Sequence, residues 1–329
     1  MTPFLYKVAE VFLKEYGSDL YKHTFVFPNR RAAMFFQKYL AEISEKPLFS
    51  PITLTIQELF SSLSTFQQAD KIEMLVMLHK HYIKISRSDE SFDDFLYWGE
   101  MLLNDFDDVD KYLVDAKQLF RNVHNFRSLD DDLSYLNEKQ IEAIRRFWTN
   151  FMPAEGSTTK EKFQETWKIL FELYDSFRNE LIQLGRTYEG MIFREVAENA
   201  KQKDISYWDK QSYIFVGLNA LTPAEITLLT HLKNIGAADF YWDYDSPFVH
   251  DDLNRASLRV EENSTRFPSR FSISEFSGKG KEVFVRESDS DIQKQREKSK
   301  VEVIGVPSGV GQAKHLTKIL QELIKSDDF

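Results

Sequence analysis

The chain of 329 residues is 42% hydrophobic and 14% aromatic, which excludes a disordered chain and allows two domains with a sizeable core. Its net charge of −10 excludes a generally basic DNA-binding surface, because lysine and arginine make most phosphate contacts, so any DNA site must be local. The lack of cysteine excludes disulfides and thiolate metal sites, and with no signal peptide or long apolar segment we expect a cytoplasmic protein without membrane spans.

The first 65 residues alternate helix, strand, helix and strand, a rhythm typical of a parallel sheet covered by helices. Apolar residues recur at helical spacing from Phe4 onward, and the apolar run Thr24–Pro28 predicts the strand that follows. Residues 29–40 continue as a helix, and residues 52–55 predict a second strand. Because no strand or glycine-rich loop precedes the first helix, the sequence predicts no phosphate loop there.

A long all-helical segment follows, which we expect to be a large insertion of residues 66–185 in the α/β domain. Ser91 and Asp94 predict a capping box at the start of one helix, and an amphipathic helix is expected from Val109 to Val123. The last helix of the segment has a seam of apolar residues suited to packing along another helix. These residues are Phe163, Trp167, Leu170, Tyr174, Phe177, Leu181 and Leu184.

Strand signals resume after the helical segment. The run Tyr213–Val216 predicts a buried strand, and Thr222, Pro223 and Glu225 predict a capped helix after it. A further strand is expected at residues 238–242.

The chain therefore divides into several expected parts. Residues 1–65 and 186–275 form an α/β core, the segment between them is the helical insertion, and residues 276–300 form a mobile connector. Residues 301–329 are interpreted as the start of a truncated second α/β domain, with a strand at Val301–Val306 and a helix after it. A solitary strand and helix cannot bury a sheet face, so we expect the chain to be part of a longer protein.

The turn after the strand Tyr213–Val216 lacks the acids that a nucleotide hydrolase needs. In superfamily I helicases this turn carries Asp-Glu, which holds magnesium and orients the attacking water, whereas Gly217 and Leu218 occupy these positions here. The glycine-rich turn at residues 305–311 also lacks a following Lys-Ser/Thr pair, and we interpret it as a tight turn. The sequence predicts no ATP hydrolysis, no cofactor and no metal site.

Three further segments resemble superfamily I helicases. Pro28–Ala33, with the sequence PNRRAA, is similar to their DNA-contacting turn of Thr or Pro, Asn and a basic residue before Ala. Residues 52–60 are similar to the strand that ends in Thr-x-x-x-Leu, another DNA contact. Gly190–Glu195 is similar to the helix that returns from the helical insertion to the core. In the order of its elements, the chain resembles the N-terminal part of the B subunit of AddAB-type helicase-nucleases, which are PD-(D/E)XK nuclease family proteins.

This resemblance implies a RecA-like parallel sheet of the P-loop NTPase type, degenerate and without its phosphate loop. It also implies an inactivated helicase half that binds and scans single-stranded DNA in recombinational repair, beside an ATP-driven partner subunit of the helicase-nuclease. The nuclease of that family lies further along its chain, so we expect no enzymatic activity in these residues.

Arg30 and Arg31 are the best DNA-binding candidates, because two cations and Asn29 at a strand-to-helix turn can hold consecutive phosphates. An ordinary solvated helix start is the alternative. Thr55, at the end of the next strand, is expected at the same sheet edge, since the strands of a parallel sheet all point the same way.

Two aromatic residues at the carboxyl end of the last expected strand, Trp242 within it and Tyr244 just beyond it, could stack on an unpaired base. Burial of Trp242 in the sheet is the competing interpretation. Asp243 and Asp245 bracket Tyr244 and could in principle bind magnesium, which leaves an enzyme with an unfamiliar site as another hypothesis.

The acid run of Asp105, Asp107, Asp108 and Asp110 lacks the glycine and the terminal glutamate of a calcium loop, and we interpret it as a solvated helix junction. The main alternative to DNA binding is a protein-interaction scaffold without direct DNA contact, whose acidic surface repels DNA. Salt-dependent binding of single-stranded DNA distinguishes the two hypotheses.

Overall fold

The computed structural model describes residues 3–120, 158–201, 212–243, 255–271, 304–306 and 308–325. The chain divides into two units, Met1–Gly280 and Lys281–Phe329, and each is described by itself.

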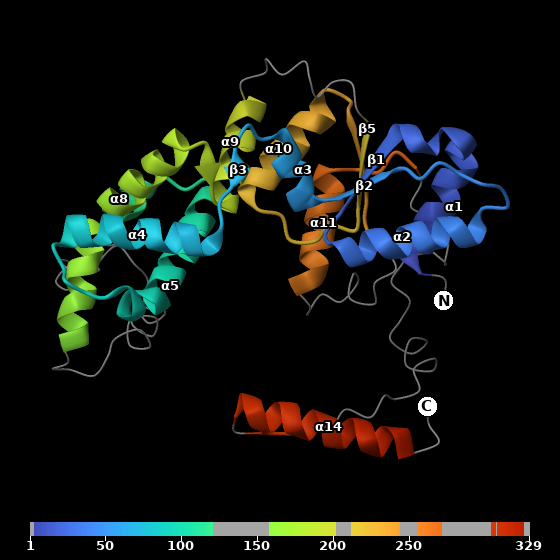
Figure 1. Ribbon diagram of the computed structural model, residues 1–329. Helices are drawn as coiled ribbons and strands as arrows, with labels where there is room; N and C mark the ends of the chain where they lie inside the picture. Colours follow the sequence, from blue (N-terminus) through green and yellow to red (C-terminus); the bar gives the residue numbers. More distant parts are fainter. Residues whose placement is uncertain are drawn as a thin grey trace, which may run out of the picture. The chain divides into compact units, whose positions relative to one another are not determined.

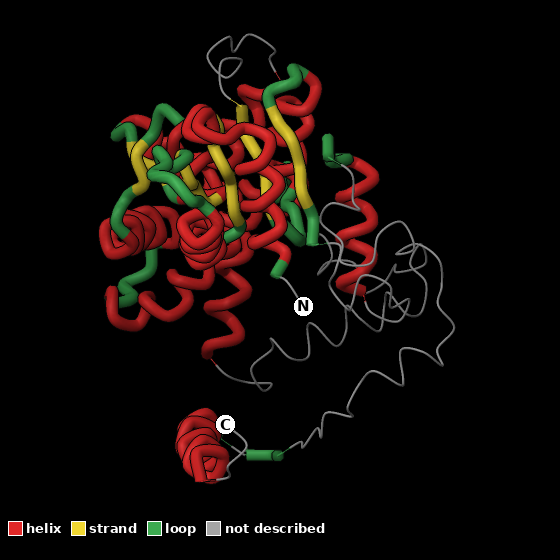
Figure 2. Tube along the Cα trace, turned by 90° about the vertical axis from the view of Figure 1, so that its right-hand side faces the viewer, coloured by secondary structure: helices red, strands yellow, loops and turns green. Residues whose placement is uncertain are grey.

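The first unit contains a sheet of four parallel strands in the order β2-β1-β5-β6. Strands are the yellow segments of Figure 2, among the red helices. The strands are β1 (His23–Phe27), β2 (Ile52–Thr55), β5 (Ser212–Val216) and β6 (Ala238–Tyr241). The central strands β1 and β5 are buried at every position but the first, and their buried positions are apolar apart from Thr24, as is typical of strands covered on both faces. The expected α/β class and these strands are confirmed.

Helices cover both faces of this sheet (Figure 1). One face carries α1 (Phe4–Tyr16), which leads through a 3₁₀ turn at Gly17–Lys22 into β1, and α2 (Arg30–Ile43). The other face carries α3 (Ile56–Leu63), α9 (Glu189–Lys201) and α10 (Pro223–Asn234). Both layers share one hydrophobic core with the strands, which includes Phe12, Phe36, Phe60, Ile192, Phe215 and Leu228.

The order of the strands reverses at β1. The chain first moves outward from β1 to β2, and later returns past β1 to form β5 and then β6. The carboxyl ends of β1 and β5 are therefore neighbours from which the chain departs in opposite directions. In open α/β sheets this kind of reversal is where ligands bind, outside the carboxyl ends of the strands.

A second hydrophobic core lies in the helices between β2 and β5. These helices are α4 (Lys71–Ser86), α5 (Phe92–Lys111) and α8 (Thr158–Gln183), and we call them the helical unit. The short strands β3 (Gln67–Gln68) and β4 (Arg186–Thr187) pair in parallel where the chain enters and leaves it. Its core includes Leu78, Phe95, Phe106, Leu173, Phe177 and Leu181.

The helix expected from Val109 to Val123 is wrong. α5 continues to Lys111, the chain turns at residues 112–115, and a new helix begins at Ala116. The turn contains Leu113 with a φ of 54°, which no helix can continue through. The side chain of Asp115 then accepts a hydrogen bond from the backbone N–H of Gln118 and caps the new helix. Residues 121–157 lie outside the described part of the chain.

The second unit contains α14 (Gly309–Lys325). The strand expected at Val301–Val306 is wrong in its described part, because residues 304–306 are not in a strand. A strand needs a neighbour to pair with its backbone, and no strand is described among residues 281–329. Residues 301–303 and the expected connector at 276–300 lie outside the described residues. No helix in the described segments is sufficiently long and apolar to cross a membrane.

Candidate nucleic-acid interface

The turn after β1 places Asn29 at the start of α2. Asn29 has an extended backbone, with a φ of −158°, and its side-chain oxygen accepts a hydrogen bond of 3.0 Å from the backbone N–H of Ala32. This contact caps α2, since the first N–H groups of a helix have no partner inside it. The amide nitrogen of Asn29 is not needed for the cap and can donate elsewhere.

Arg30 and Arg31 occupy the first two positions of α2, where the positive end of the helix dipole lies. The first turn of α2 contains no acidic residue, and each cation there destabilises a helix by about 0.3–1 kcal/mol. Three other sheet helices that begin at this edge follow the opposite rule, whereas the first turn of α1 contains neither acid nor arginine. Their first turns contain Glu58 in α3, Glu189 in α9 and Glu225 in α10. The two arginines thus depart from the usual charge pattern of a helix start. A bound anion would offset their unfavourable position.

Arg30 is held by the neighbouring turn. Its Nε lies 2.9 Å and its Nη2 2.8 Å from Oε1 of Glu58, which belongs to the first turn of α3. The side chain of Arg30 is nevertheless 86% exposed, because Glu58 contacts only one side of the guanidinium. Arg31 is also exposed, and no hydrogen bond or ion pair joins it to another described residue.

Thr55 lies beside the two arginines, but its hydroxyl and its backbone N–H already form hydrogen bonds within the protein. Residues Phe27 and Thr55 are partners in the β1–β2 register, so the two turns are adjacent. The hydroxyl of Thr55 accepts from the backbone N–H of Glu58 at 3.1 Å, and the backbone N–H of Thr55 donates to Oε2 of Glu58 at 2.8 Å. This is a capping box, and Thr55 is only 8% exposed. The structure therefore brings Asn29, Arg30, Arg31 and Thr55 together, with Thr55 as a support rather than a surface contact.

The aromatic candidates do not join this group. Trp242 is 1% exposed, and its Nε1 donates a 2.9 Å hydrogen bond to the backbone oxygen of Phe267. A base cannot stack on a side chain that is buried on both faces, so the competing interpretation of Trp242 as a core residue is correct. Tyr244 and Asp245 lie outside the described residues, and Asp243 is described and exposed.

The turn after β5 adjoins the same edge. Gly217 has a φ of 67°, a conformation that favours glycine, and a side chain there would lie 3.6 Å from the ring of Phe4. Leu218 is buried. Glu225, the nearest acid in sequence, forms the capping box of α10 with Thr222, and burial raises its pKa. No group of three or more potential metal ligands occurs among the described residues.

The acids of this edge have partners of their own. Glu189 accepts from Nζ of Lys111 at 2.8 Å and from the side chain of Gln57 at 2.7 Å, while Glu58 binds Arg30. Among the described residues of this edge, Arg31 and the outer side of Arg30 are thus the cations presented to solvent. At the turns after β1 and β2, two arginines face one carboxylate, that of Glu58, although the chain as a whole is acidic.

Asp110 corrects the interpretation of the acid run as a solvated junction. Its side chain is fully buried and accepts hydrogen bonds from the hydroxyls of Tyr174, at 2.7 Å, and Tyr188. Arg194 of α9 also donates to it through Nε, and Arg194 Nη2 donates to two backbone oxygens near the end of α5. Burial, followed by the neighbouring Asp110, raises the pKa of both tyrosines, so they remain donors. The signal was available, since Asp110 continues the apolar spacing of Leu103 and Phe106.

Asp107 belongs to the same junction. It accepts from the backbone N–H of Gly190 at 2.5 Å and from Nζ of Lys111 at 2.7 Å. These contacts fix α9 of the sheet layer against α5 of the helical unit.

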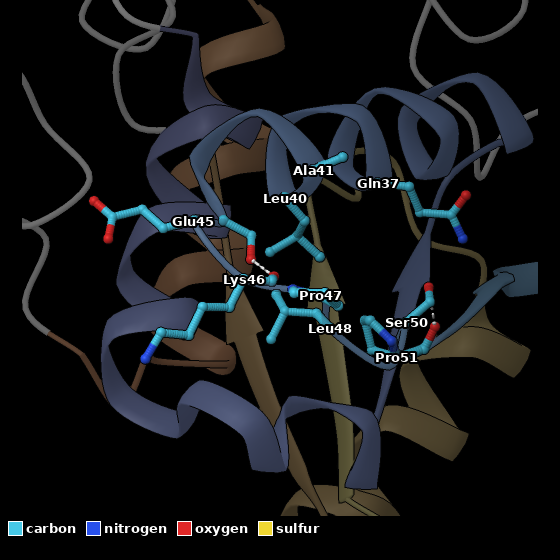
Figure 3. Close-up of a pocket in the computed structure, with 10 residues that line it drawn as sticks. Gln37, Leu40, Ala41, Glu45, Lys46, Pro47, Leu48, Ser50 and Pro51 are labelled. Atoms are coloured by element: carbon cyan, nitrogen blue, oxygen red, sulfur yellow. Dashed lines mark hydrogen bonds between the residues drawn. The ribbon is translucent and has the colours of Figure 1, made fainter.

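A cavity of about 430 Å³ lies at the opposite end of α2 from Asn29 (Figure 3). Leu40 and Leu48 line it with Pro47 and Pro51, between the last turn of α2 and the loop before β2. It is therefore separate from the arginine turn.

No protein-family model matches the chain, and no curated protein does either.

Proposed function

We propose that this chain is a non-hydrolytic, RecA-like helicase module that binds single-stranded DNA through the carboxyl edge of its parallel sheet. In this proposal the helical unit is an insertion in the helicase core. Movement along DNA is driven by an ATP-hydrolysing partner subunit of a recombinational repair helicase-nuclease.

The observation that carries the proposal is the position of Arg30 and Arg31. They begin a helix where cations are unfavourable, at the edge where the strand order reverses, and they face solvent. A phosphate at this position would be bound by the N–H groups of α2 and by two charged side chains. Such binding would account for two cations at a helix start, where they are otherwise unfavourable.

The presence of two exposed arginines favours a chain of phosphates over a single small anion. The two arginines are consecutive and exposed, so they can contact successive phosphates of a flexible strand. The burial of Trp242 removes one candidate for base stacking, so contact with the sugar-phosphate backbone is the main mode that we propose.

Binding of a fluorescein-labelled oligothymidylate to the complete chain, measured by anisotropy at several salt concentrations, tests the proposal. The double variant Arg30→Ala/Arg31→Ala removes two phosphate contacts. We expect weaker binding and a salt slope smaller by about 1.4, which is about 0.7 for each lost contact on a single strand.

The matched control is Lys80→Ala/Lys84→Ala on α4, which removes the same charge from the exposed face of the helical unit. Its affinity and salt slope should stay close to those of the unchanged protein. If the arginine variant behaves like this control, the edge does not bind DNA and the proposal fails.

The scaffold hypothesis has its own supporting observation. Phe49 and Tyr97 are 81% and 80% exposed, and side chains of this size are typical anchors of protein interfaces. A chain that binds no DNA at low salt in the same assay would favour this second function.

A further inference from the structure

Glu58 connects the two turns of the candidate interface. Its Oε2 accepts from the backbone N–H of Thr55 at 2.8 Å, and its Oε1 accepts from Nε and Nη2 of Arg30 at 2.9 Å and 2.8 Å. One carboxylate therefore caps α3 and pairs with the first residue of α2.

The contact uses the side of Arg30 that a phosphate would use. A guanidinium holds its N–H groups in a fixed planar fork, and the Nε and Nη2 groups together form one of its favoured sides for binding an oxyanion. In this structure the carboxylate of Glu58 occupies that side. A phosphate must either displace Glu58 from this side or bind the N–H groups that remain at the end of the guanidinium, two on Nη1 and one on Nη2, beside a carboxylate that repels it.

The two partners differ in freedom. Glu58 is fixed by its two-way capping contact with Thr55, whereas the side chain of Arg30 is 86% exposed. The backbone N–H of Thr55 and then the arginine hold the pKa of Glu58 below its usual value, despite partial burial. The negative charge is therefore present at neutral pH and stays in place when Arg30 turns toward a phosphate.

We infer that Glu58 is a built-in competitor of the DNA phosphate for Arg30, and that it limits the affinity of the interface for single-stranded DNA. The inference rests on the proposed function, because it assigns a regulating residue to the same edge. Such a competitor makes each contact with Arg30 easy to break, so that the strand can be released and bound again one phosphate further along.

The substitution Glu58→Gln separates this role from the structural one. Glutamine at the third position of a helix keeps the capping box with Thr55, so α3 should retain its start. It carries no charge, so Arg30 becomes available to phosphate. We expect binding of the labelled oligothymidylate to tighten by up to about fivefold, the equivalent of one exposed ion pair.

The salt slope should also become steeper by up to about 0.7, because Arg30 gains a full contact with a phosphate. A purely structural role of Glu58 would not steepen it. In the Arg30→Ala background the same substitution should change neither quantity, since the competitor then has nothing to hold. The control Glu42→Gln removes an equal charge near the other end of α2 and should leave binding unchanged.

The outcomes are distinguishable. If Arg31→Ala weakens binding while Glu58→Gln leaves affinity and slope unchanged, the competitor is wrong and the proposed function stands. If neither Arg30→Ala nor Arg31→Ala alters binding, the proposed function fails. If Glu58→Gln tightens binding equally in the Arg30→Ala background, the glutamate repels DNA directly and the inferred competition for Arg30 is overturned. A thermal melt of each variant shows that it is folded.

Discussion

The carboxylate of Asp110 lies in the interior, where a charge is stable only if it is paired and hydrogen-bonded. Tyr174, Tyr188 and Arg194 supply the donors, and Nε of Arg178 lies 3.8 Å away. These residues come from distant parts of the sequence, so the side chain acts as a hub between α5, α8 and α9. Asp110 therefore stabilises the contact between the helical unit and the sheet layer.

Removal of one hydrogen-bond partner of Asp110 should destabilise the protein, because a buried carboxylate then lacks a compensating charge. In Arg194→Met the carboxylate of Asp110 loses its closest cation, and we expect the free energy of unfolding in urea to fall by about 3–5 kcal/mol. The control Arg186→Met removes a surface pair with Glu73, whose partners are 43% and 45% exposed, and should cost at most about 1 kcal/mol. Equal effects of the two substitutions would show that the hub is not a buried charge site.

The contact between α5 and α9 is unusually close at Gly190. A β-carbon at this position would lie 2.3 Å from the backbone oxygen of Asp107, and backbone cannot rotate away as a side chain can. The same glycine donates its N–H to the side chain of Asp107. Glycine is thus required here by space and not by its own backbone angles.

Gly190→Ala should consequently destabilise the protein, although alanine is the better helix former. We expect overpacking to lower the free energy of unfolding by about 1–3 kcal/mol, measured by urea denaturation. Lys201→Ala, at an exposed position of the same helix, should stay within about 0.5 kcal/mol. A neutral or stabilising Gly190→Ala would mean that α9 can move away from α5 without loss.

Elements with local signals could be predicted from the sequence almost to the residue. The helix Pro223–Asn234 begins where Thr222 and Glu225 predict its capping box, and the strand Ile52–Thr55 ends where the next helix cap begins. These features depend on neighbours within a few residues, so the sequence pattern contains them.

Features that depend on distant partners could not be predicted in this way. The turn after Lys111 is bound by Arg194, which donates to the backbone oxygens of Val109 and Val114. The strand expected at Val301–Val306 has no described neighbour. The candidate site likewise has one part that depends on local sequence and one that depends on distant partners. The position of Arg30 and Arg31 follows from their turn, whereas the capture of Arg30 by Glu58 depends on strand pairing.

At the scale of the whole molecule, the first unit contains two hydrophobic cores that α9 connects. Residues such as Ile192 belong to the core of the sheet, and Met191 to that of the helical unit. Adjacent residues of one helix thus face different cores, which couples the helical unit to the edge that carries the arginines.

The unit should bind no nucleotide. The turn after β5 contains Gly217 and Leu218 and no acid that could hold magnesium, and the ring of Phe4 lies against it. Isothermal titration of the complete chain with ATP and magnesium should show no saturable site. Introducing Asp-Glu at these two positions should still produce no hydrolysis, because the sequence of residues 1–329 contains no phosphate-loop motif. A site of micromolar affinity would contradict the prediction.

The pairing of β1 with β5 has a consequence for synthesis on the ribosome. The contact between His23 and Ser212 at the start of these strands spans 189 residues, so β1 emerges long before its central neighbour exists. At about 5–20 residues per second, this wait lasts roughly 10–40 s. During that time the edge of β1 that later pairs with β5 has no permanent partner. Only α1, α2, β2 or a chaperone can shield this strongly apolar strand from other chains. The nascent chain is therefore most prone to aggregation while the helical unit is being made.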